Sequence, residues 1–223
     1  MQHFDTAALI SAVLDIPAGH VRIEAGERAD ATVEVVPADA SNGSDVKAAE
    51  QIEVAYADGV LRVEAPAATS RILGSSGSVA VTVQLPVGSH IEAKSAAGDF
   101  RGVGRLGDVA YEGAQGTVEI EEAAGARIVL QSGDVSVGRL GGSADIATQQ
   151  GAIRIAEASK GTVKLTTQHG EIAVGAARGV SASLDAGTSY GRIDNALTNT
   201  DGASAALNIH ATTSYGDITA RSL

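Results

Sequence analysis

Short alternations of apolar and polar residues recur along the C-terminal two-thirds of the chain. The phrase TTQHGEIAV at 166–174 returns, lightly altered, as TTSYGDITA at 212–220. In each such phrase, apolar side chains such as Ile172 and Val174 follow an anchoring glycine at the second and fourth positions, usually with a polar residue between them. A period of two predicts a short β-strand with one buried face. The anchoring glycines are Gly98, Gly116, Gly133, Gly151, Gly170, Gly191 and Gly216.

The spacings between these glycines are 18, 17, 18, 19, 21 and 25 residues, which is typical of a repeat array. A second alternating pair precedes each glycine, as Val163 and Leu165 precede Gly170. Burying four side chains contributes roughly 6–12 kcal/mol, whereas ordering one unit costs on the order of 25 kcal/mol, so the units must stack. We predict an all-β fold: a single-stranded parallel β-helix, or solenoid, with about 18 residues per coil. The usual crossover chirality favours a right-handed one.

The N-terminal third is less regular and reads as strands with antiparallel tendency at 20–27, 31–37, 52–66 and 78–86. The pair Asp58-Gly59 is a strong hairpin signal within the third of these. The segments 41–50 and 68–77 have loop composition. We therefore expect residues 1–90 to form a β cap continuous with the solenoid, and residues 91–223 to form the repeats.

The formal net charge of −11 and the pI near 4.8 leave no basic footprint for a nucleic acid. The chain has no cysteine, which excludes disulfides and thiolate metal sites. Its first residues lack the pattern of a signal peptide, and no apolar stretch approaches the length of a membrane span. We expect a cytoplasmic location, no membrane insertion and no nucleic-acid partner.

Two motifs match catalytic patterns by chance. GTSYG at 187–191 has the form of a nucleophile elbow, but no helical period follows it, and TTSYG recurs at 212–216. GVGRLG at 102–107 resembles a dinucleotide fingerprint without the helix that it needs. The five histidines are scattered. Asp99, Asp134 and Asp217 follow anchor glycines and are the residues we considered as calcium ligands, but a calcium-binding roll needs a regular Asp at this position, and the other coils have Thr117, Ala152, Glu171 and Arg192 there. We expect no enzyme activity, no catalytic residue, no cofactor and no metal.

Polar corners that precede four of the anchor glycines are the candidate binding site. When the coils stack, these corners form one strip, with Tyr190 near Tyr215. One interpretation is that the strip consists of ladders that stabilise the corners by packing like side chains together. The other is a surface for a glycan, a peptide or a protein, because polar groups beside aromatic rings suit such ligands. The candidate strip consists of Gln149, Gln150, Gln168, His169, Tyr190 and Tyr215.

The combined pattern resembles a known family. LQSGDVSVG at 130–138, the opening LDIPAGHVRIEAGE and the segment VAVTVQLPVGSHIEAKSAAGDF at 79–100 are similar to the bacterial β-strand-repeat family labelled "putative adhesin", a domain of unknown function, in its actinobacterial type. The likeness covers nearly the whole chain. It implies a single-stranded β-helix and carries over no catalytic residue.

These observations predict a non-catalytic, adhesin-like β-helical scaffold. ITARSL at 218–223 stops within reach of the last strand, and an exposed parallel edge invites another strand. Our first hypothesis is therefore self-association through an exposed edge of the C-terminal coil, either with a second copy or with an unidentified protein. The alternative is a glycan- or protein-binding module that uses the polar corner strip.

Overall fold

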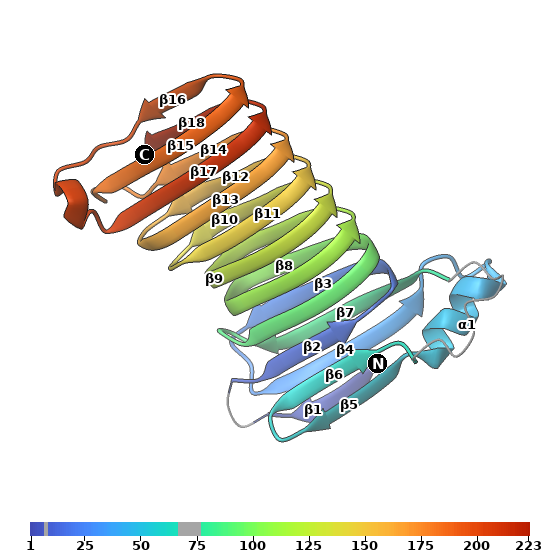
Figure 1. Cartoon of the computed structure of the whole chain (residues 1–223). Helices are drawn as coiled ribbons and strands as arrows, with labels where there is room; N and C mark the ends of the chain where they lie inside the picture. Colours follow the sequence, from blue (N-terminus) through green and yellow to red (C-terminus); the bar gives the residue numbers. More distant parts are fainter. Residues whose placement is uncertain (7–8, 67–76) are drawn as a thin grey trace. The chain divides into compact units, whose positions relative to one another are not determined.

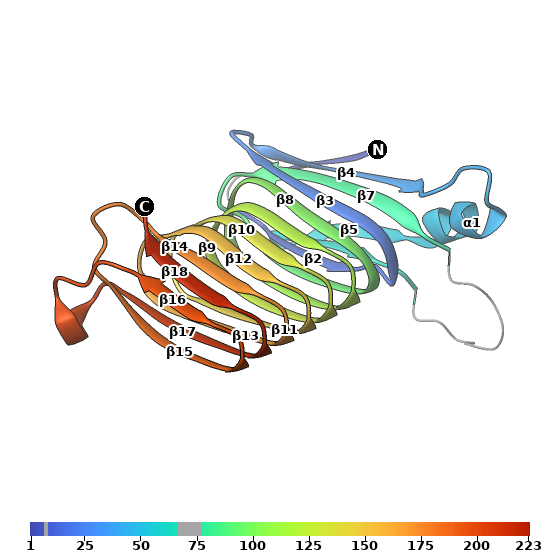
Figure 2. The ribbon, with the colours of Figure 1, turned by 90° about the horizontal axis from the view of Figure 1, so that it is seen from above.

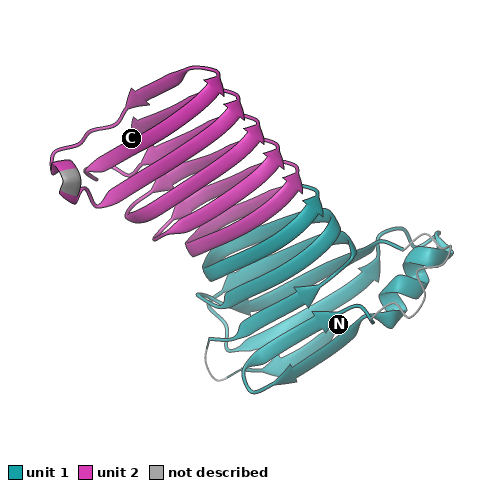
Figure 3. Cartoon of the chain, viewed as in Figure 1, with its two compact units in different colours: residues 1–116 teal, residues 117–223 magenta. Residues whose placement is uncertain are grey.

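The computed structural model describes residues 1–6, 9–66 and 77–223, apart from the side chain of Ala203. It divides the chain into two compact units, Met1–Gly116 and Thr117–Leu223 (Figure 3). The fold is nearly all β, which confirms the predicted all-β solenoid. The strands of unit 2 are β9 (Val118–Ser132), β10 (Val135–Leu140), β11 (Ala144–Gln150), β12 (Ile153–Ala158), β13 (Gly161–His169), β14 (Ile172–Ala176), β15 (Ala182–Tyr190), β16 (Ile193–Ala196), β17 (Leu207–Tyr215) and β18 (Ile218–Ser222).

Unit 2 is a wound ribbon with two faces of parallel strands. On one face the order is β9–β10–β12–β14–β18–β16, and on the other it is β9–β11–β13–β17–β15. The predicted columns are in register: Val135 pairs with Val118 on one side and with Ile153 on the other. The side chains of these columns are buried between the faces. The period-two pattern therefore encodes both the strands and the direction in which they bury their apolar sides.

The anchor glycines stack directly on one another. A Cβ added to Gly151 would lie 2.0 Å from the carbonyl oxygen of Gly133, and a Cβ on Gly170 would lie 2.0 Å from that of Gly151. Gly151 also has φ +140°, a conformation that L side chains rarely adopt. The corner therefore requires glycine for two reasons, of which the close approach of the neighbouring coil was not predicted.

The last described coil does not lie at the edge of unit 2. We call residues 207–222 (β17 and β18) the inserted coil and residues 182–196 (β15 and β16) the edge coil. The inserted coil lies between the edge coil and the coil of β13 and β14, although both precede it in the chain (Figures 1 and 2). The predicted exposed edge on the C-terminal coil is therefore wrong, because both strands of that coil are paired on both sides. Among the described strands, it is the two strands of the edge coil that are paired on one side only.

Side-chain polarity explains this order. In the column that contains Val174, the next residues outward are Ala220 and then Asn195. Val174 and Ala220 are buried, and Asn195 is exposed at the edge. If the coils stacked in sequence order, Asn195 would occupy the interior between two apolar residues, where an unpaired amide costs about 1–3 kcal/mol. The observed order buries the apolar coil and leaves the polar one outside.

Unit 1 combines parallel coils with antiparallel flanking strands. β2 lies between β6 and β8, and β3 lies between β7 and β8, all in parallel. Antiparallel pairs join β1 to β4, β4 to β7 and β5 to β6. The parallel pairs of this region were not predicted. The strands are β1 (Gln2–Asp5), β2 (Ser11–Asp15), β3 (Ala18–Gly26), β4 (Asp30–Pro37), β5 (Glu53–Ala57), β6 (Val60–Glu64), β7 (Val79–Pro86) and β8 (His90–Gln115).

Two local predictions in unit 1 had opposite outcomes. The Asp58-Gly59 hairpin is confirmed, since it joins β5 to β6 with positive φ at both residues. The loop predicted at 41–50 is wrong, because this segment forms helix α1 (Gly43–Gln51). Asn42 caps the helix by accepting the N–H of Ser44, and buried Asp45 accepts the N–H of Ser78 at 2.9 Å. The loop predicted at 68–77 lies outside the described residues except for Gly77.

Candidate binding strip at the corner of unit 2

The structure brings most of the predicted strip residues into one column. The strands β11, β13, β17 and β15 all end at the anchor corner, and their last residues pair in register. Continuing from Ser132 at the end of β9, the column in space is Ser132, Gln150, His169, Tyr215 and Tyr190. The two tyrosines lie side by side as predicted, although Tyr215 comes before Tyr190 in space because of the inserted coil.

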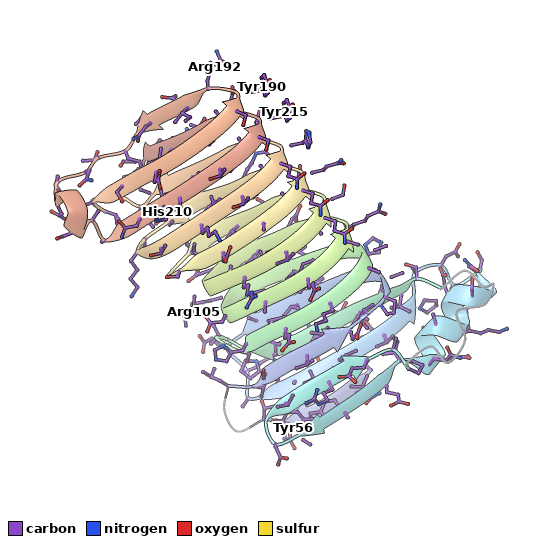
Figure 4. The ribbon with its side chains drawn as sticks, viewed as in Figure 1. Tyr56, Arg105, Tyr190, Arg192, His210 and Tyr215 are labelled. Atoms are coloured by element: carbon purple, nitrogen blue, oxygen red, sulfur yellow. The ribbon has the colours of Figure 1, made fainter. Side chains whose placement is uncertain are left out.

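Three rings of this column stack face to face. The rings of His169 and Tyr215 have centroids 5.0 Å apart and planes within 2°, and those of Tyr215 and Tyr190 have centroids 4.8 Å apart and planes within 3°. Both tyrosines project from the corner (Figure 4). Tyr190 is 67% exposed and Tyr215 is 50% exposed. A ligand can therefore meet the ring edges and phenol groups along the stack, and a full ring face only at Tyr190.

Exposed amides lie beside the ring column. Gln149 and Gln150 end β11, and Gln168 lies next to His169 at the end of β13. All three side chains are exposed. Each amide offers both donors and acceptors. The strip therefore combines hydrogen-bonding groups with aromatic edges on a single row of corners.

Buried threonines hold the base of the strip. Thr167, Thr213 and Thr188 lie two residues before their rings, and each hydroxyl donates to the carbonyl oxygen of a glycine in the neighbouring coil at 3.1 Å. Thr167 and Thr213 are buried. These bonds fix the spacing of the rings from one coil to the next. The sequence prediction missed this role, although the repeated TT and TS pairs are its signal.

Aspartates after the anchor glycines also link one coil to the next. Asp217 accepts the N–H of Arg192 at 2.8 Å and its guanidinium at 3.3 Å. The backbone N–H and then the side chain of Arg192 hold the pKa of the Asp217 carboxyl below its ordinary value. Asp134 accepts the N–H of Ala152 in the same way, at 2.8 Å. Two of the aspartates that we considered as calcium ligands thus hydrogen-bond the next corner.

Four of the five histidines pair with a carboxylate instead of with one another. His210 lies 3.2 Å from Asp185 of the edge coil, and the register places it four residues along the strand from Ser189, on the order of 13 Å away. The structure therefore does not bring together the serine and histidine of the nucleophile-elbow match. Within the described ranges, no group of three or more His, Asp or Glu side chains converges. The other pairs are His3 with Asp30, His20 with Asp99 and His90 with Asp108.

Wound β coils with glycine corners and an exposed row of polar and aromatic side chains define this protein as a β-solenoid of repeated single coils. The chain belongs to the Toastrack DUF4097 family, which matches residues 13–222. This match confirms the resemblance to the β-strand-repeat family of unknown function. A search of curated proteins found no match.

Several solved structures are similar over nearly their whole length. A "putative cell adhesion protein" from Clostridium sporogenes has 11% identity and a TM-score of 0.41, with 100% of this chain and 98% of that chain covered. A "putative adhesin" from Bacteroides fragilis has 12% identity and a TM-score of 0.48, with 98% and 95% covered. A "putative lipid binding protein" from Parabacteroides distasonis has 12% identity and a TM-score of 0.46, with 98% and 95% covered. In the described part of this chain, no helix has the length and apolar character to cross a bilayer.

Proposed function

We propose that this protein is a non-catalytic, adhesin-like scaffold that binds a glycan or a protein partner along the corner strip. The observation that carries the proposal is the row of three stacked rings, two of them at least half exposed. Exposed aromatic rings beside amides suit ligands that present both hydroxyl or amide groups and apolar surface. The rigid base of buried threonines presents these groups in a fixed arrangement, which lowers the entropy cost of binding.

The corner itself does not need the rings. Ser132 and Gln150 occupy the same column in the two coils before His169, and their strands pair in the same register. Polar residues are therefore sufficient to build this corner. The tyrosines instead expose apolar ring surface to water in unit 2, which is a cost that binding a ligand would recover.

Replacing the rings by the residue that the same column uses elsewhere tests this function. Tyr190→Gln and Tyr215→Gln keep a side chain that the corner accommodates, and Val129→Gln is the matched control because Val129 is an exposed apolar residue of β9 outside the strip. We expect glycan-array or partner binding to fall at least about tenfold, or ~1.4 kcal/mol, for each tyrosine, with the control unchanged. Binding that is undiminished in the double tyrosine variant would refute the proposal.

Self-association at the edge coil is a second candidate. β15 and β16 each pair with a single neighbour among the described strands, and Ile193 of β16 is 46% exposed. Unpaired strands of this kind are templates for another chain. Static light scattering would show a larger mass for the wild type than for Ile193→Lys, which places a charge on that edge. Equal masses at high protein concentration would exclude this candidate.

A further inference from the structure

The inserted coil lies between two coils that are formed by earlier parts of the chain, namely the coil of β13 and β14 and the edge coil. β17 pairs with β13 on one side and with β15 on the other, and β18 pairs with β14 and β16. Its interior side chains are buried at this position, with Leu207, Ile209 and Ile218 each 1% exposed or less. The coils of β10 to β14 simply add to the coil before them. The inserted coil instead completes a gap between two coils that precede it.

The edge coil cannot close this gap by itself. If it moved inward to pair with β13 and β14, Asn195 would take the place of Ala220 beside Val174, and Gly187 would take the place of Thr212 beside Thr166. Val174, which is buried beside Ala220, would then lie against the amide of an edge residue instead of against an apolar side chain. The gap therefore fits a coil with the apolar pattern of residues 207–222 better than it fits its own neighbour.

A single linker, residues 197–206, connects the inserted coil to the rest of unit 2. Hydrogen bonds at Ser181 hold this linker: its hydroxyl donates to Asn199 at 3.2 Å and accepts the N–H groups of Thr200 and Asp201 at 3.1 Å. Figures 1 and 4 show the linker projecting from the strands on the side opposite Tyr190. When the linker opens and the inserted coil leaves the gap, β13 and β14 lose one neighbour, and β15 and β16 lose the single neighbour that each has among the described strands. An inserted coil from a second copy restores all of these pairs.

We infer that two copies of this chain exchange their inserted coils, so that residues 207–222 of each copy occupy the gap between β13–β14 and β15–β16 of the other. Exchange keeps every contact of the inserted coil and changes only the path of the linker, which makes it a low-cost route to a dimer. The partner is a second copy because it supplies the same register: Lys164, His210 and Asp185 are aligned across the three strands. This inference is independent of the corner strip and of edge-to-edge pairing.

A cross-copy disulfide tests the exchange directly, because the chain has no native cysteine. Lys164 and His210 are exposed neighbours in parallel strands, about 4.8 Å apart and within the Cα distances that disulfides bridge. Full-length Lys164→Cys and His210→Cys chains are mixed in equal amounts, unfolded, refolded together at high concentration and oxidised. Complete exchange places about half of all chains in mixed disulfide dimers, detected by mass spectrometry.

Two controls make the outcome decisive. Asp145→Cys mixed with Lys164→Cys tests two neighbouring coils that follow each other in the chain, and it should give no mixed dimer. The double variant Lys164→Cys/His210→Cys should form the disulfide, which verifies the pairing. A mixture of the single variants that yields no more mixed dimer than the Asp145→Cys control would overturn the exchange. A double variant that forms no disulfide would overturn the coil order on which the exchange rests.

Discussion

Replacing Gly151 by alanine is the sharpest test of the corner geometry. The added Cβ would lie 2.0 Å from the carbonyl oxygen and 2.5 Å from the carbonyl carbon of Gly133. Both atoms are backbone, so no flexible side chain can move aside. The neighbouring coils would have to separate at this corner, where the N–H of Gly133 donates to Gln150 at 2.7 Å and that of Gly151 donates to His169 at 2.9 Å.

The magnitude follows from two costs. An L residue held at φ +140° is strained by about 1–3 kcal/mol. Losing one of the two corner hydrogen bonds, which lie at the surface, adds about 0.5–1.5 kcal/mol. We therefore expect Gly151→Ala to lower the free energy of unfolding by roughly 1.5–4.5 kcal/mol, which lies between an average and a severe single substitution.

Urea unfolding followed by far-ultraviolet circular dichroism measures this loss. Gly187→Ala is the matched control, because Gly187 lies on the edge strand β15 with no atom within 4 Å of an added Cβ and without a positive φ. We expect the control to match the wild type within about 0.5 kcal/mol. If Gly151→Ala unfolds at the same urea concentration as Gly187→Ala, the close stacking of the anchor glycines is refuted.

Three further predictions concern coil order and ionisation. Ala220→Asn should lower the free energy of unfolding in urea by about 1–3 kcal/mol, because Ala220 is buried between two coils. Asn195→Val should change it little, because Asn195 is exposed at the edge. If Asn195→Val were the more destabilising of the two, stacking of the coils in sequence order would be favoured. Burial raises the pKa of the Tyr111 phenol. Its contribution to the free energy of unfolding is therefore present below about pH 10, the ordinary pKa of tyrosine, and is lost as the pH rises through the higher pKa of the folded state. A titration of tyrosine ionisation followed by absorbance at 295 nm should lose its most alkaline step in Tyr111→Phe. Arg192 lowers the pKa of Asp217, so that contribution is present above the ordinary carboxyl pKa and is lost as pH falls through the lower folded value; the protection factor of the Arg192 amide, which is its exchange rate compared with the intrinsic rate at the same pH, should fall on acidification in the wild type more than in Asp217→Asn.

The repeat was predictable because one chemical rule acts at every coil. Glycine is needed where neighbouring corners touch, and an apolar residue is needed wherever a side chain points inward, so Val135, Ile153 and Ile172 recur at matching positions. The alignment of Tyr190 with Tyr215 follows from the same register. Any protein that stacks such coils must repeat these residues, and the repetition can be read without a structure.

The helix α1 was not predictable by the same rule. The residues SNGSD at 41–45, which include the N-cap and the start of the helix, have turn composition, and the helix lacks a strong apolar face. The helix depends on contacts distant in sequence: Asp45 accepts the N–H of Ser78 across a gap of 33 residues. Local composition therefore favours a loop, whereas the tertiary hydrogen bond between Asp45 and Ser78 stabilises the helix.

The order of the coils cannot be predicted from the periodicity, because it depends on how single residues differ from one repeat to the next. Every coil carries the same alternation, so any stacking order satisfies the pattern equally well, and sequence order is the natural assumption. The differences lie in single residues: Asn195 and Ile193 of the edge coil occupy the columns of Ala220 and Ile218 in the inserted coil. Only the polar residue discriminates, because isoleucine is compatible with either position. The strands with an exposed edge therefore lie on the coil that tolerates water, and Tyr190 at the end of this coil is the one strip residue that lies on it.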